Sequence, residues 1–69
     1  MNEITFVVEE DEAGGYCARA LGHSIFTQAE TRDELEEMVR DAVRCHFEPE
    51  QHAPKLIHLH YVRDEVIAL

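Results

Sequence analysis

The chain has 69 residues, of which 45% are hydrophobic, and its 15 acidic residues outnumber six basic ones to give a formal net charge of −9. A chain of this length forms one domain, expected over residues 1–69, and is too small for both a large core and a deep pocket. The negative charge also argues against direct DNA or RNA binding, which depends on clustered Lys and Arg side chains.

The small size of the chain also favours association with other chains. A single core of this kind rarely supplies more than about 3 to 5 kcal/mol, so domains without disulfides or metals often gain stability by associating. We therefore expect a homo-oligomer, a dimer by default. The acidic surface favours encounter with a basic protein, although excess charge can also serve solubility alone.

The chain opens without a basic and apolar leader, and no apolar run approaches the roughly 20 residues that span a bilayer. We therefore expect a cytoplasmic protein with no membrane contact. Cys17 and Cys45 are too few for a secreted disulfide framework, and each is expected to be a small buried side chain.

The first expected strand covers residues 4–8, in which Ile4, Phe6 and Val8 fall on one face at a period of two. Residues 9–15 then interrupt the pattern with four consecutive acids and two glycines, which suit an exposed turn with positive φ. Four like charges at a loop tip are usually solvated, and a role toward a metal or a partner is the alternative.

Residues 16–21 and 25–29 are expected to be the second and third strands, so that the first three strands form a meander. At Thr31 the pattern changes, because Thr31 and Glu34 match a capping box that begins a helix. The apolar residues of this helix follow the spacing of one buried stripe. They are Leu35, Met38, Val39, Ala42 and Val43.

Pro49 ends the helix, and a polar loop with two prolines separates it from a fourth strand over residues 56–62. Ile57, Leu59 and Tyr61 alternate onto one face of that strand and should meet the helix. Residues 66–69 are too apolar for a free tail, so they either lengthen the last strand or pack against another subunit.

The order β-β-β-α-β predicts a two-layer α+β fold, with an antiparallel four-stranded sheet and one helix packed on one face. The other face of the sheet is left open and is a natural association surface. It is expected to carry Val7, His58, His60 and Val62.

Histidines supply the candidate chemistry. His58 and His60 lie about 7 Å apart on one strand face, a spacing that two metal ligands can use when other elements add more. His46 and His52 are possible third ligands, although His46 also continues the helical stripe and is expected to be partly buried. Solvated or interface side chains are the simpler interpretation of the pair, so we assign no catalytic, cofactor-binding or metal-binding residue.

Several of these positions resemble the HicB-like family of small domains from type II toxin–antitoxin systems. The turn into the second strand has the family's Gly-Gly-aromatic sequence, the third strand carries a Thr-Gln pair, and the helix begins with a Thr-x-x-Glu motif. The matching residues are Gly14, Gly15, Tyr16, Thr27, Gln28, Thr31, Glu34, Leu35, Ala42 and Val43. These segments cover about two-thirds of the chain.

The resemblance implies a single HicB-like domain over residues 1–69, without the C-terminal DNA-binding segment of full antitoxins and without cofactors. It also implies a non-enzymatic protein-binding module that occludes a small basic RNA-cleaving toxin. Two alternatives stay open: an orphan structural homodimer of the same fold, and a small metal-binding protein or enzyme that uses His58 and His60. The family motifs assign no residue to a partner interface.

Overall fold

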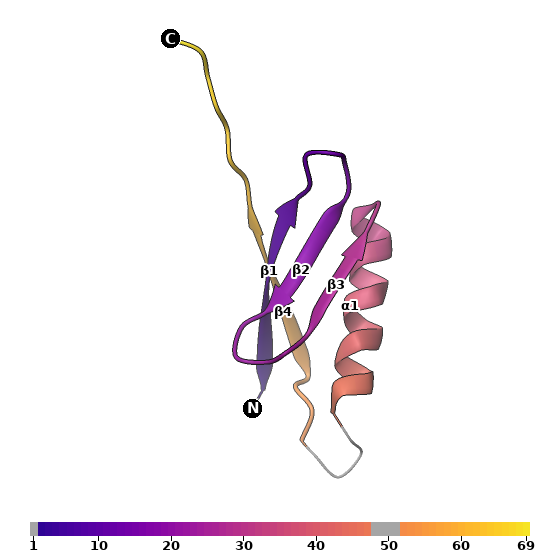
Figure 1. Cartoon of the computed structure of the whole chain (residues 1–69). Helices are drawn as coiled ribbons and strands as arrows, with labels where there is room; N and C mark the ends of the chain where they lie inside the picture. Colours follow the sequence, from indigo (N-terminus) through magenta and orange to yellow (C-terminus); the bar gives the residue numbers. More distant parts are fainter. Residues whose placement is uncertain (1, 48–51) are drawn as a thin grey trace.

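The computed structural model describes residues 2–47 and 52–69 and contains the five expected elements in the expected order. The strands form one four-stranded sheet, and α1 lies on one face of it beside β3 and β2 (Figure 1). The α+β class is therefore confirmed. The elements are β1 (Glu3–Glu10), β2 (Tyr16–Ala20), β3 (Phe26–Ala29), α1 (Arg32–His46) and β4 (Leu56–Val62).

The sheet is mixed, so the expectation of a purely antiparallel sheet is wrong. The strand order is β3-β2-β1-β4, with β1 and β3 antiparallel to β2 but β4 parallel to β1. The cause is the direction of the chain. Because β1 and β3 run the same way and α1 carries the chain back, β4 must run parallel to whichever outer strand it joins.

The core lies between α1 and the sheet. Alternate residues of β1 and one stripe of α1 are buried in it, as their spacings predicted. They are Ile4, Phe6 and Val8 from β1, and Leu35, Val39 and Val43 from α1. Met38 was expected in the same stripe but is 39% exposed, because it lies toward the edge of the helix face that meets the sheet.

The structure contains two local motifs that the sequence predicted. Thr31 Oγ1 accepts a hydrogen bond from the backbone N–H of Glu34 at 3.1 Å, which confirms the predicted start of α1. Gly14 and Gly15 have φ values of 91° and 94° in the turn between β1 and β2, as the glycine pair predicted. A Cβ on Gly15 would also lie only 2.9 Å from the Ala29 carbonyl oxygen.

The pairing of β1 with β4 decides which side chains share a face. Phe6 is level with Leu59 on the helix side, and Val7 is level with His60 on the open side. The expected division of β4 into two faces is therefore confirmed. However, α1 covers the part of the sheet around β3 and β2, so Leu59 is only half-buried and Tyr61 is 37% exposed.

The expectation of buried cysteines is wrong for Cys45, which is exposed on α1 away from the buried stripe. Cys17 is half-buried and lies on the open side of β2, where its thiol is 3.7 Å from the Glu9 carbonyl oxygen. Both described cysteines are free thiols in the structure. Neither contributes to the hydrophobic core.

Residues 63–69 leave the sheet as an extended tail beyond the end of β4 (Figure 1). Val66 and Ile67 are 96% and 90% exposed. The tail therefore does not lengthen β4, which was one of its two expected roles. In residues 2–47 and 52–69, no helix has the length and hydropathy needed to cross a membrane.

Candidate partner-binding surfaces

An acidic cleft of about 480 Å³ lies where the turn after β1 meets the beginning of the tail. Parallel pairing of β1 and β4 brings their last residues to the same end of the sheet, so carboxylates far apart in the sequence become neighbours. Arg63 also lines the cleft, and its guanidinium lies 3.9 Å from the Glu65 carboxylate. The carboxylate residues are Glu9, Glu10, Asp11, Glu12, Asp64 and Glu65.

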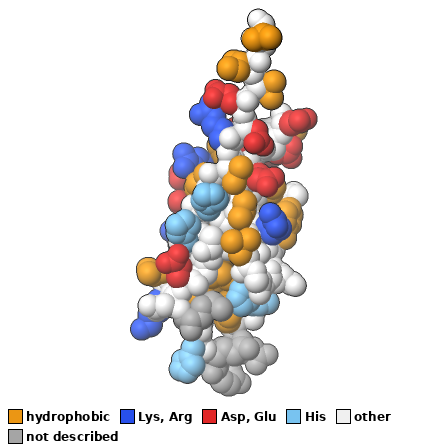
Figure 2. Space-filling model, turned by 90° about the vertical axis from the view of Figure 1, so that its left-hand side faces the viewer, with side chains coloured by type: hydrophobic (Ala, Val, Ile, Leu, Met, Phe, Trp, Pro, Cys, Tyr) orange, Lys and Arg blue, Asp and Glu red, His pale blue; other side chains and the backbone are white. Residues whose placement is uncertain are grey.

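Apolar side chains border this cleft. Val62 and Val66 contribute to its lining, and the tail continues from it with Ile67 and Leu69 exposed. Figure 2 shows acidic side chains gathered near the end from which the tail departs. An acidic rim beside exposed apolar side chains is the complement of a basic surface that also carries apolar contacts.

An aromatic seam joins α1 to β4 beside this end of the sheet. The guanidinium carbon of Arg32 lies 4.5 Å from the centre of the Tyr61 ring, and the Tyr16 and Tyr61 rings meet edge to face at 6.4 Å. The interaction with the Tyr61 side chain raises the pKa of Arg32. Sequence analysis missed this seam because Arg32 and Tyr61 are far apart in the chain.

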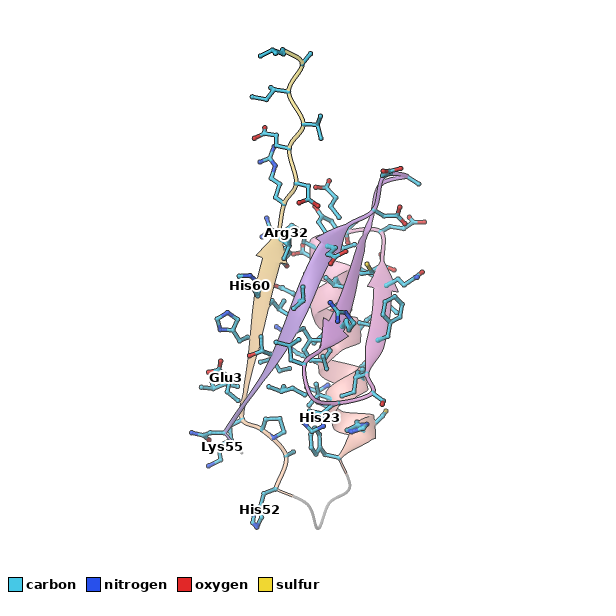
Figure 3. All side chains as sticks on the ribbon, turned by 60° about the vertical axis from the view of Figure 1, so that its left-hand side comes forward. Glu3, His23, Arg32, His52, Lys55 and His60 are labelled. Carbon is cyan, nitrogen blue, oxygen red and sulfur yellow. The ribbon has the colours of Figure 1, made fainter. Side chains whose placement is uncertain are left out.

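The histidine pair of β4 has the predicted arrangement. The His58 and His60 rings project from the open face with their centres 6.4 Å apart. Glu3 of β1 places a carboxylate oxygen 3.3 Å from Nδ1 of His58. Glu3 and His60 both project from the β1–β4 side of the sheet in Figure 3. Glu3 therefore contacts Nδ1 of His58, and Nε2 of the same ring is not part of this contact.

The other histidines do not complete a metal site with this pair. His46 is exposed, contrary to the expected partial burial, and its ring meets His23 and Phe47 edge to face at 5.5 Å and 5.1 Å. His23 and His52 lie toward the other end of the molecule from His60 in Figure 3. Within the part of the chain that the structure describes, no three metal-binding side chains come together.

The open face also carries large exposed apolar side chains, of which Leu21 and Phe26 were not expected there. Leu21, Phe26 and Leu56 are 51%, 60% and 59% exposed. Figure 2 shows a band of hydrophobic side chains next to histidines on the side of the molecule where β1 and β4 lie. The missed signal is period-two alternation, because the buried Thr27 places its neighbour Phe26 on the opposite face.

Comparison with known proteins identifies similar chains. A UPF0150 protein of Thermotoga maritima is 48% identical over 67 residues, which cover 97% of this chain and 93% of the relative. A UPF0150 protein of Archaeoglobus fulgidus is 64% identical over 53 residues, which cover 77% of each chain. No family model and no solved structure matches the chain. The names of these two relatives state no activity.

Proposed function

We propose that this chain, which belongs to the UPF0150 family, is a non-enzymatic protein-binding module of the HicB antitoxin type. In this proposal it binds a small basic RNA-cleaving protein in the cytoplasm and occludes the surface that contacts RNA. The observation that supports the proposal best is the acidic cleft beside the exposed apolar tail.

The charge of the cleft supports a basic partner. Six carboxylates and one guanidinium line it, so their charges combine into a negative local field. Such a field raises the rate of encounter with a positively charged surface and disfavours acidic partners. The attraction is screened within about 8 to 10 Å at physiological salt, so binding should weaken as salt rises.

The tail supports a stable complex after encounter. Charge complementarity alone gives orientation and association rate, whereas apolar contact supplies much of the lasting affinity. The tail is already extended and presents Val66, Ile67 and Leu69 to the solvent. An extended segment of this kind can lie along the edge of a partner's sheet and insert alternate side chains into it. Covering the partner in this way requires no chemistry from the chain.

An orphan structural homodimer is the second candidate, and the unpaired outer edge of β4 favours it. The two candidates differ in what they predict for the protein in its native host. An antitoxin-like module should be isolated with a small basic protein, while an orphan homodimer should be isolated alone.

Capture of partners from a native-host lysate at low salt tests the proposal. The tagged wild type is compared with a cleft variant, Glu10→Gln, Glu12→Gln and Asp64→Asn. The matched control removes three charges from exposed positions of α1 by Glu36→Gln, Glu37→Gln and Asp41→Asn. Mass spectrometry then identifies what elutes and in what proportion.

We expect a stoichiometric small basic protein with the wild type and the helix control, released as salt rises. We expect loss of most of this partner from the cleft variant. Removing residues 66–69 should weaken retention without changing the circular dichroism of the isolated domain, because these side chains contact solvent in the structure. Equal capture by the wild type and the cleft variant would overturn the role of the cleft.

A further inference from the structure

The outer edge of β4 is a second candidate surface, separate from the acidic cleft. The backbone N–H of Leu56 donates to the Asn2 carbonyl at 3.1 Å, which turns Leu56 toward β1. Because alternate residues of a paired strand face opposite neighbours, Ile57, Leu59 and Tyr61 direct their backbone N–H and C=O groups away from β1. Among the described residues no strand pairs with this edge.

This edge lacks the features that usually protect an outer strand. Proteins protect such edges with charged side chains, proline, bulges or very short strands. The sequence of β4, LIHLHYV, has no proline and no Asp, Glu, Lys or Arg over seven residues. The opposite edge, β3, has four residues and lies against α1. The β4 edge is therefore the more available of the two for pairing with another chain.

Charge indicates a second copy of this chain as the occupant. Two molecules with a net charge of −9 repel each other over most orientations. The strand β4 carries no acidic side chain and is flanked by Lys55 and Arg63, which reduces repulsion along the strand when two β4 edges approach. A core of this size also gains stability by associating.

We propose that two copies pair antiparallel through their β4 edges, and that this pairing creates a four-histidine site for a divalent transition-metal ion such as Zn²⁺. The register that pairs every residue of β4 places Leu59 opposite Leu59 of the second copy and Ile57 opposite Tyr61. These residues direct their backbone groups outward, so each pair exchanges two hydrogen bonds. The sheets of the two copies then form one continuous sheet through their β4 strands.

In the same register His58 of one copy lies opposite His60 of the second copy, and His60 lies opposite His58. These positions are non-hydrogen-bonded pairs, whose Cα atoms are about 4.5 Å apart. Four imidazoles therefore gather around the two-fold axis on the open face. Within one chain the pair has no third ligand among the described residues, and the second copy supplies the missing two.

The chemistry of the group fits a zinc-class ion. Zn²⁺ takes four nitrogen or sulfur ligands in tetrahedral geometry, with Zn–N distances of about 2.0 to 2.1 Å. Histidines that bind metal usually place a carboxylate on the other ring nitrogen, and Glu3 occupies that position 3.3 Å from Nδ1 of His58. One ion per dimer is the expected stoichiometry.

The surroundings of the interface are compatible with this arrangement. The helix α1 packs on β3 and β2, so the two helices stay clear of the β4 edges. Lys55 comes near Arg63 of the second copy, but both are exposed and Arg63 already lies 3.9 Å from Glu65. Such exposed like charges cost little at physiological salt.

Sedimentation equilibrium of the purified chain, in EDTA and with added Zn²⁺, tests the proposal. His58→Glu/His60→Glu places carboxylates directly opposite one another at the interface, and Phe26→Glu/Gln28→Glu adds the same two charges to the open face at the other edge. His58→Ala/His60→Ala removes the metal ligands. His23→Ala/His46→Ala removes a different neighbouring pair and serves as its control.

We expect a dimer in EDTA, with a dissociation constant that Zn²⁺ lowers by about tenfold or more, a change of about 1.4 kcal/mol. The His58→Glu/His60→Glu chain should dissociate more readily, while Phe26→Glu/Gln28→Glu should match the wild type. The His58→Ala/His60→Ala chain should lose the response to Zn²⁺, and the His23→Ala/His46→Ala chain should keep it.

A wild-type chain that stays monomeric with and without Zn²⁺ would overturn the pairing. A dimer equally stable with His58→Glu/His60→Glu would place the interface elsewhere and also overturn it. A wild-type dimer that is weakened by His58→Glu/His60→Glu but does not respond to Zn²⁺ would overturn the metal site. These outcomes are independent of the basic partner, because the purified chain is studied alone.

Discussion

The guanidinium carbon of Arg32 lies 4.5 Å from the centre of the Tyr61 ring. This contact joins the first residue of α1 to the end of β4, across the part of the sheet that the helix leaves uncovered. The interaction with the Tyr61 side chain also raises the pKa of Arg32.

Replacing Arg32 with Ala should lower the urea midpoint, because the cation–π contact with Tyr61 is lost. Replacing Tyr61 with Leu should have a similar effect, and the double variant should be destabilised by less than the sum of the two single changes. Fluorescence or circular dichroism in urea measures all three chains. Strict additivity would show that the two side chains do not interact in solution.

Replacing Thr31 with Ala should destabilise the domain by about 1 kcal/mol, since the first turn of α1 loses its side-chain acceptor. Thr31→Ser keeps a hydroxyl at the same position and should retain most of the stability. Thermal unfolding followed at 222 nm compares the chains. Equal losses for Ala and Ser would mean that the methyl group of Thr31, and not its hydroxyl, matters.

Replacing Gly15 with Ala should cost more than replacing Gly14 with Ala. Both residues have positive φ, which costs a non-glycine residue about 1 to 2 kcal/mol. Only at Gly15 would the added Cβ also meet a backbone atom, the Ala29 carbonyl oxygen at 2.9 Å, whereas Gly14 has open space. Urea unfolding of the two variants decides the order, and a larger loss at Gly14 would contradict this turn geometry.

Replacing Leu35 with Ala should leave the domain largely unfolded at 37 °C. Leu35 is completely buried, and Leu→Ala in a core costs about 2 to 5 kcal/mol. That loss is comparable with the about 3 to 5 kcal/mol that such a small core supplies. Leu21→Ala, at a half-exposed position, should change stability by less than about 0.5 kcal/mol and is the control.

The local elements could be predicted from the sequence because their signals are local. Period-two spacing predicted the buried face of β1 at Ile4, Phe6 and Val8, and Thr31 with Glu34 predicted the start of α1. The direction of β4 depends on how the chain returns through α1, which no local pattern encodes. An antiparallel arrangement therefore appeared consistent with the same strands.

The wrong direction expected for β4 is also the reason that the acidic cleft was not predicted. In an antiparallel pair the end of β4 would lie beside the beginning of β1, far from Glu9 and Glu10. Parallel pairing reverses this and brings Asp64 and Glu65 to the acidic turn after β1. The seam between Arg32 and Tyr61 was missed for a related reason, since it depends on the packing of α1 relative to β4. The spacing of His58 and His60 needed only strand geometry and was predicted correctly.

The proposed occlusion of a toxin is best tested by measuring whether the chain inhibits RNA cleavage by the captured basic protein. Purified chain is titrated against that protein while cleavage of a labelled RNA is followed. We expect cleavage to fall to background near equimolar chain and to return with the cleft variant Glu10→Gln/Glu12→Gln/Asp64→Asn. Cleavage that persists at a large excess of wild-type chain, or isolation of the chain from its host without a basic partner, would contradict the proposed occlusion.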